Sequence, residues 1–131
     1  MKTRLLFSVC VLGLLLAVTG CQCTSTLTLS KGTYQLTRKF PPNTWEALIQ
    51  NPIVKTHEAV GAGLKDLGLI PITNRVDQVS GLVEATFADG VELEIVLLAV
   101  SPNLTRISIR CVIMGDRVRT ETVFGAIEKH L

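Results

Sequence analysis

The sequence predicts an α+β domain in which an antiparallel sheet of about five strands carries two main helices on one face. Two kinds of periodicity support this prediction. Apolar and polar residues alternate through much of the second half of the chain, which is the pattern of half-buried strands. Two other segments repeat apolar residues every three or four positions, as helices that cover a sheet do. The predicted order is strand, helix, four strands, helix.

The first predicted strand is Tyr34–Phe40, which alternates and ends at Pro41-Pro42. After it, Asn43 and Glu46 resemble a capping box, in which the two side chains would satisfy the first backbone N–H groups of a helix. We therefore expect helical structure to begin here and to include Trp45, Leu48 and Ile49.

Asn51-Pro52 is a second signal for the start of a helix, with Asn at the N-cap and Pro at the first helical position. The region is therefore two helical pieces, or one helix kinked at Pro52. Gly68 is expected to end it as a left-handed C-cap. Gly61 and Gly63 weaken the helix, or let it lie close against the sheet. The apolar face of the second piece consists of Ile53, His57, Val60, Leu64 and Leu67.

The next four predicted strands begin at Ile70 and then cover Val79–Ala88, Val91–Val100 and Leu104–Val112. Pro71 makes the first of them an edge strand or its entry. Asp89-Gly90 predicts a three-residue hairpin turn with a bulge, in which Gly90 takes the left-handed conformation. Matching apolar side chains across this hairpin predicts Phe87 opposite Leu93.

The last segment is predicted to be a helix with Asp116 as its N-cap, where a negative charge suits the helix dipole. Lys129 and His130 lie near its C-terminal end, where positive charge is favoured. Its apolar face consists of Val123, Phe124, Ile127 and Leu131.

The N-terminus has the pattern of a secretory signal. Lys2 and Arg4 precede the uncharged stretch Leu5–Val18, which is shorter than the roughly 20 residues of a membrane-spanning helix. The stretch ends in Val18-Thr19-Gly20-Cys21, which resembles the lipobox of bacterial lipoproteins. The resemblance implies cleavage before Cys21 and lipidation of its thiol, and two or three acyl chains anchor a protein firmly. An uncleaved N-terminal anchor is the alternative.

This pattern predicts three parts: a signal peptide at 1–20, a lipidated tether at 21–31 and a single domain at 32–131. By resemblance to lipoprotein sorting in Gram-negative bacteria, Gln22 in place of aspartate favours the outer membrane, with the domain facing the periplasm. Loss of Lys2 and Arg4 with the leader leaves 11 basic side chains against 11 acidic ones. The cleaved chain therefore has no global field to attract nucleic acid.

The residues do not predict a catalytic, cofactor or metal site. His57 on its apolar face is expected to be a hydrogen-bonded core residue, and His130 a solvated one. Cys21-Gln22-Cys23 lacks the spacing of a zinc site. Cys23 and Cys111 could form a disulfide, or Cys111 could be a buried small hydrophobe. A set of acidic residues predicts a solvated sheet face rather than a Ca²⁺ site: Asp77, Glu84, Asp89, Glu92 and Glu94.

The predicted pairing leaves an apolar patch on the sheet face opposite the helices, and it consists of Leu82, Val96, Leu98 and Val100. Exposed apolar patches mark interaction surfaces. The first strand, the tether or a second copy of the chain could also cover it. At the other end of this face, Glu94 is predicted to oppose Arg110 as an exposed ion pair.

Several segments together resemble a family of small bacterial lipoproteins, known as domain of unknown function 3568. They are LKDLGL (Leu64–Leu69), SGLVEATFADGVELEI (Ser80–Ile95), TRISIR (Thr105–Arg110) and Gly115-Asp116. The stretch Trp45–Val60 is longer than this resemblance leads us to expect before LKDLGL, which bears on the first predicted helix. The resemblance implies an envelope compartment and a fold, but no activity.

Three functions follow as hypotheses. The first is a non-enzymatic module that docks on an envelope protein, or on itself, through the apolar patch. The second is a carrier or sensor of a small amphiphile held near Trp45 and Phe124. The third is an enzyme, which would need a cleft with convergent titratable groups that the sequence does not indicate.

Overall fold

The computed structural model describes residues 26–28, 34–39, 44–111 and 117–131. Within them, alternating side chains build strands and two apolar stripes build helices. The elements are β1 (Thr26–Thr28), β2 (Gln35–Lys39), β3 (Thr44–Ile49), α1 (Ile53–Asp66), β4 (Pro71–Val76), β5 (Ser80–Thr86), β6 (Glu92–Ser101), β7 (Leu104–Cys111) and α2 (Arg117–Glu128).

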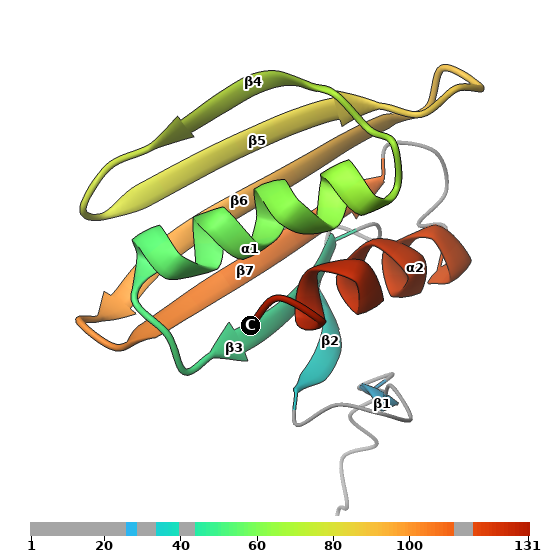
Figure 1. The fold of residues 1–131 in the computed structure, drawn as a ribbon. Helices are drawn as coiled ribbons and strands as arrows, with labels where there is room; N and C mark the ends of the chain where they lie inside the picture. The colour runs from blue at the N-terminus through green and yellow to red at the C-terminus, as the bar shows by residue number, and fades with distance from the viewer. Residues whose placement is uncertain (1–25, 29–33, 40–43, 112–116) are drawn as a thin grey trace, which may run out of the picture.

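The strands form one antiparallel sheet in the order β1-β2-β3-β7-β6-β5-β4. Both helices lie on the same face of it (Figure 1). Helix α1 contacts β4, β5, β6 and β7, and α2 contacts β7 and α1. The predicted α+β class is confirmed, with seven strands in the described residues instead of about five. The additional strands are β3 and β1, and β1 lies in the segment predicted as a tether.

The prediction of a helix over Trp45, Leu48 and Ile49 is wrong, because residues 44–49 form β3. Trp45, Ala47 and Ile49 are buried and alternate with more exposed neighbours, which is the period of a strand. Six residues are too few for a stable isolated helix, whereas β7 offers a complete ladder of hydrogen-bond partners. Pairing with a distant strand therefore outweighs the local capping signal.

Helix α1 starts one residue later than predicted. Pro52 takes the N-cap position with an extended ψ of 152°, and no side-chain hydrogen bond caps this end. At the other end Gly68 has φ of 70°, as predicted. The N–H of Leu69 bonds to the carbonyl of Leu64 at 2.9 Å and that of Gly68 to the carbonyl of Lys65 at 3.0 Å, so two of the carbonyls in the last turn of the helix are satisfied.

The β5–β6 hairpin confirms the turn and corrects the register. Phe87 N–H bonds to the Val91 carbonyl at 2.9 Å across the three residues 88–90, and Gly90 has φ of 85°. This short connection sets Ala85, not Phe87, opposite Leu93. Because the error is two residues, an even number, each side chain still lies on the predicted face.

The core lies between the sheet and the helices. Phe124 and Ile127 of α2 are fully buried there, as predicted, whereas Leu131 is half-buried; the N-cap predicted at Asp116 lies outside the described residues. Gly63 lies against Ile127 of α2 rather than against the sheet. The close approach that glycine permits is therefore between the two helices.

Candidate interaction surface

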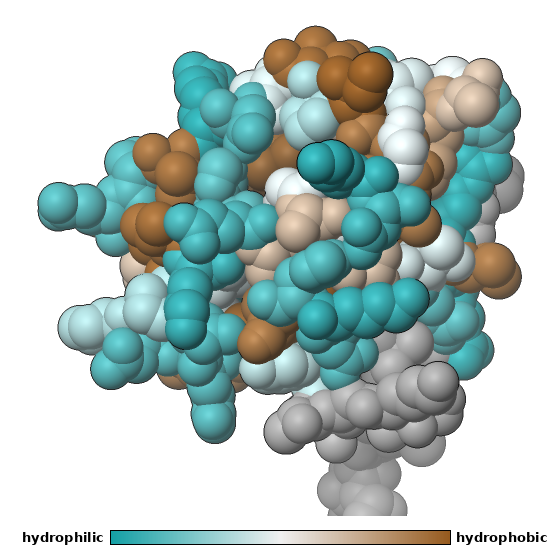
Figure 2. All heavy atoms as spheres, viewed as in Figure 1, coloured by the Kyte–Doolittle hydropathy of each residue, from teal (hydrophilic) through white to brown (hydrophobic). Residues whose placement is uncertain are grey.

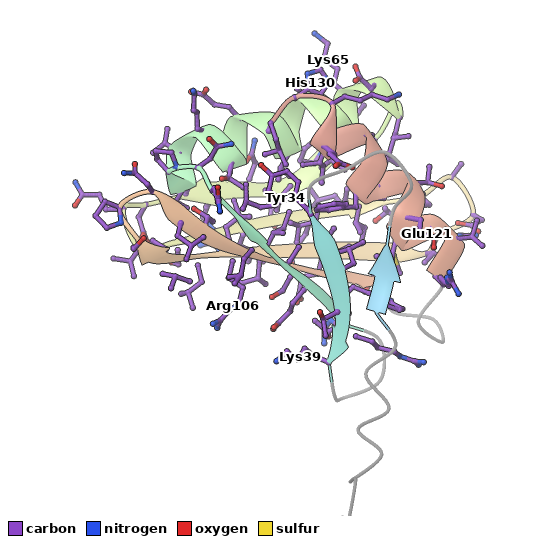
Figure 3. The ribbon with its side chains drawn as sticks, turned by 90° about the horizontal axis from the view of Figure 1, so that it is seen from below. Tyr34, Lys39, Lys65, Arg106, Glu121 and His130 are labelled. Atoms are coloured by element: carbon purple, nitrogen blue, oxygen red, sulfur yellow. The ribbon has the colours of Figure 1, made fainter. Side chains whose placement is uncertain are left out.

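The outer face of the sheet, opposite α1 and α2, carries the predicted apolar patch. In Figure 3, Arg106 and Lys39 extend from this outer side, while Lys65 and His130 lie on the helix side. Leu82 of β5 pairs with Val96 of β6, and Val96, Leu98 and Val100 follow at alternate positions along β6. Both described helices pack on the opposite face, so neither covers these residues.

The apolar patch is exposed to solvent in the described structure. Val96 is 37 % exposed, Leu98 41 % and Val100 47 %, while Leu82 is half-buried. These aliphatic side chains are neighbours on one sheet face. Exposed apolar patches of this kind mark interaction surfaces.

Leu48 borders the apolar patch and was missed from the sequence. It is 52 % exposed and lies on β3, where it pairs with Arg106, which in turn pairs with Leu98. The sequence did contain the pattern of a strand here, because apolar Trp45, Ala47 and Ile49 occupy alternate positions. The predicted helix concealed it, because helical spacing places Leu48 and Ile49 together on an inward stripe.

The rest of the outer face is charged. Arg110 and Glu94 are paired across β7 and β6 with 2.7 Å between Nη2 and Oε2, which confirms the predicted pair. Glu46 of β3 lies 3.9 Å from the Lys39 amine and accepts a hydrogen bond of 3.3 Å from the Ser108 hydroxyl. Charged residues therefore border the apolar patch, with Arg106 beside Leu98 and Arg75 beside Leu82.

Two hollows adjoin this face. A shallow one of about 900 Å³ at the end of the β4–β5 hairpin is lined by His57, Asn74, Leu82 and Val96 among others. A smaller one of about 240 Å³ is lined by Glu84, Glu92, Glu94 and Arg110. The described residues contain no group of three or more His, Cys, Asp or Glu side chains that could hold a metal ion.

The helix side has a different character. Figure 2 shows hydrophilic atoms over much of that side, and hydrophobic atoms at its upper margin, over β4. Ile70 and Ile72, in and beside this edge strand, are 83 % and 75 % exposed. Pro71 and a register irregularity between Pro71 and Thr73 interrupt the same stretch, which discourages further strand pairing there.

Two carboxylates have lowered pKa values, and both serve turns. Backbone hydrogen bonds from Ser80 and Val79, each 2.7 Å to Oδ1, hold the pKa of Asp77 below its ordinary value. A two-pronged pair with Arg119 of α2 does the same for the pKa of Asp89. These interactions hold the turn between β4 and β5 and attach the turn between β5 and β6 to α2.

The two histidines bind neighbouring elements. His57 is half-buried on α1, with Nε2 2.5 Å from Oδ1 of Asn74 on β4. His130 is exposed, as predicted, and its Nε2 lies 2.6 Å from Oδ2 of Asp66 at the end of α1. Each therefore ties α1 to another part of the fold.

Trp45 and Phe124, the residues of the predicted amphiphile site, are both buried. Phe124 contacts Tyr34 edge to face, with ring centroids 6.4 Å apart. Three hollows lined by described residues lie elsewhere and include neither ring. The indole N–H of Trp45 is buried with no hydrogen-bond partner among the described residues, which is uncommon and costly.

The predicted lipidation residue Cys21, the signal peptide and Cys23 lie outside the described residues. Cys111 is buried at the end of β7, and its Sγ lies 3.9 Å from the Thr120 hydroxyl of α2. Neither α1 nor α2, the helices of the described residues, has the length and apolar character needed to cross a membrane.

A search of the curated proteins yields no match. The model of one family, described as "Protein of unknown function (DUF3568)", matches residues 3–130 and thus nearly the whole chain. This range includes all the segments on which the resemblance rested. The chain therefore belongs to the family of proteins of unknown function DUF3568.

Proposed function

We propose that this chain is a lipid-anchored, non-enzymatic protein-interaction module of the bacterial cell envelope. One observation carries the proposal: the apolar patch lies uncovered on the sheet face opposite both described helices. Its centre is aliphatic and its border carries charged side chains, the arrangement of an interface core with a polar rim.

The anchor is part of the same proposal. Charge, a short apolar run and Val18-Thr19-Gly20-Cys21 support lipidation at Cys21, and Gln22 supports an outer-membrane location facing the periplasm. Cys21→Ser should abolish labelling by a fatty-acid probe, while Cys23→Ser, two residues away, should leave it unchanged. Equal labelling of the Cys21→Ser variant would refute the anchor.

Photocrosslinking in cells tests the docking surface. A benzophenone amino acid at position 98, in the full lipidated chain, should give a discrete protein adduct that mass spectrometry identifies. The matched control is the same probe at Val54, which is 53 % exposed but lies on α1 on the helix side. An adduct from Val54 alone, or from neither position, would refute docking through the patch.

The alternative function is a carrier or sensor of a small amphiphile. The unpartnered indole N–H of Trp45 favours it, because a ligand oxygen could accept that hydrogen bond. Native mass spectrometry of the purified chain should then detect a bound lipid that Trp45→Phe releases. A chain that carries no ligand in either form would exclude this function.

A further inference from the structure

We propose that the apolar patch binds a second copy of this chain, sheet face to sheet face, about a two-fold axis that runs along β6. This rests on the proposed function, in which the patch is the binding surface. The argument comes from the charges that the strand register places on either side of β6.

The central row of the outer face runs across the sheet as Glu46, Ser108, Val96, Leu82 and Arg75. Glu46 and Arg75 lie two strands from Val96 on opposite sides. Rotation about β6 therefore places Glu46 over Arg75 of the second copy, and Arg75 over Glu46 of the second copy. Arg75 is exposed and forms no ion pair within the described part of the chain.

The next row repeats this complementarity. It runs Arg110, Glu94 and Glu84, so the same rotation places Arg110 over Glu84 of the second copy. Glu94 lies on the axis and faces Glu94 of the second copy, while Arg110 of its own chain pairs with it at 2.7 Å. Within one chain Glu84 lies directly opposite Glu94, a like-charge pair that is unfavourable, and no described cation forms an ion pair with Glu84. The second copy would supply that cation.

The third row places the aliphatic side chains on the axis. It runs Arg106, Leu98 and Ser80, so Leu98 meets Leu98 of the second copy. Arg106 lies over Ser80, whose hydroxyl donates a 3.3 Å hydrogen bond to Asp77. A carboxylate therefore lies beside the position that the guanidinium of the second copy would occupy.

The spacing of packed sheets permits these pairs. Stacked sheets lie about 10 Å apart and cross at about 30°. For residues two strands from the axis, such a crossing shifts a side chain by about 5 Å along the strand relative to its partner in the second copy. The side chains of a glutamate and an arginine are long enough to meet across this shift. A two-fold axis perpendicular to the strands would instead place Arg110 over Arg106 and Glu94 over Leu98. It would also place Glu46 over Glu46 and Arg75 over Arg75. Of these two axes the charges therefore favour the one along β6, where Glu94 is the one residue of these rows that faces its own charge.

Charge reversal tests the arrangement in the full lipidated chain, with the benzophenone at position 98. Arg75→Glu should reduce the adduct at twice the chain mass by about tenfold or more, because like charges then face each other at two symmetric positions. Glu46→Arg should reduce it as well. Co-expression of the two single variants should restore it, since positions 75 and 46 of the mixed pair then carry opposite charges at both symmetric contacts.

The control is Lys55→Glu, the same kind of reversal at an exposed position on α1, which should leave the adduct unchanged. Thermal unfolding of each variant reports whether the domain stays folded. If the amount of adduct at twice the chain mass is the same in the charge-reversal variants as in the parent, the two-fold arrangement is overturned. An adduct only with a different protein would overturn self-association but support the proposed function. Absence of any adduct would overturn both.

Discussion

Substitution of Gly63 by alanine tests how closely the two helices approach. A Cβ at this position would lie 2.7 Å from the backbone N of Ile127 and 2.8 Å from its Cα, whereas ordinary Cβ contacts begin at 3.4 Å. Helix α2 would have to move by about 0.7 Å, the difference between those distances. The obstacle is backbone, so no side-chain rotation relieves it.

The expected cost follows from two opposing effects. Overpacking of a core typically costs about 1–3 kcal/mol, and a backbone clash belongs at the upper end. Replacement of glycine by alanine inside a helix contributes about 1 kcal/mol in the other direction. Gly63→Ala should therefore lower the free energy of unfolding by about 2 kcal/mol.

Gly61→Ala is the matched control, because a Cβ there has no atom within 4 Å. It should raise the free energy of unfolding by up to about 1 kcal/mol. Urea unfolding followed by fluorescence of Trp45, the only tryptophan, measures both variants. If Gly63→Ala is as stable as Gly61→Ala, the helices do not approach as described and the reasoning fails.

Three further substitutions test other contacts. Asp89→Asn removes the charge that pairs with Arg119. Because folding lowers the pKa of Asp89 below its ordinary value of 3.8, the pair stabilises the fold above that pH, and its contribution is lost as the pH falls through the folded-state pKa. The urea midpoint of Asp89→Asn should thus lie below that of the parent at pH 7, and the gap should close in acid; a gap independent of pH would contradict this. Thr105→Val removes a buried hydroxyl that donates to the Asn51 carbonyl at 2.8 Å, and should cost about 1–2 kcal/mol in the same assay, whereas no loss would mean that water replaces the bond. Phe124→Ala empties the largest fully buried side-chain position and should cost about 3–5 kcal/mol, so a loss under 1 kcal/mol would show that α2 is not part of the core.

Where a single local pattern decides an element, the sequence predicts it well. The alternation through β5, β6 and β7 placed the correct side chains on each face, including all four residues of the apolar patch. Gly68 and Gly90 adopt positive φ because their positions require a conformation that other residues rarely take. These features depend on neighbours in the chain, which the sequence shows directly.

Predictions failed where a distant partner decides the outcome. Asn43 and Glu46 indicate a helix locally, yet residues 44–49 pair with β7, about 60 positions later, and form a strand. The same error concealed Leu48 beside the apolar patch. The role of Gly63 was equally hidden, since nothing near it in the sequence shows that Ile127 packs against it.

The sequence by itself determined the α+β class, the two faces of the sheet and the family. Each depends on periodicity or on short motifs, and both are local properties of the chain. Only the tertiary structure decided that β3 lies between β2 and β7, and hence which charges lie at equal distances from β6. Strand order and register depend on the whole core, because each strand must pair where its apolar face packs against the helices. The residues of one strand do not show which other strand provides that position.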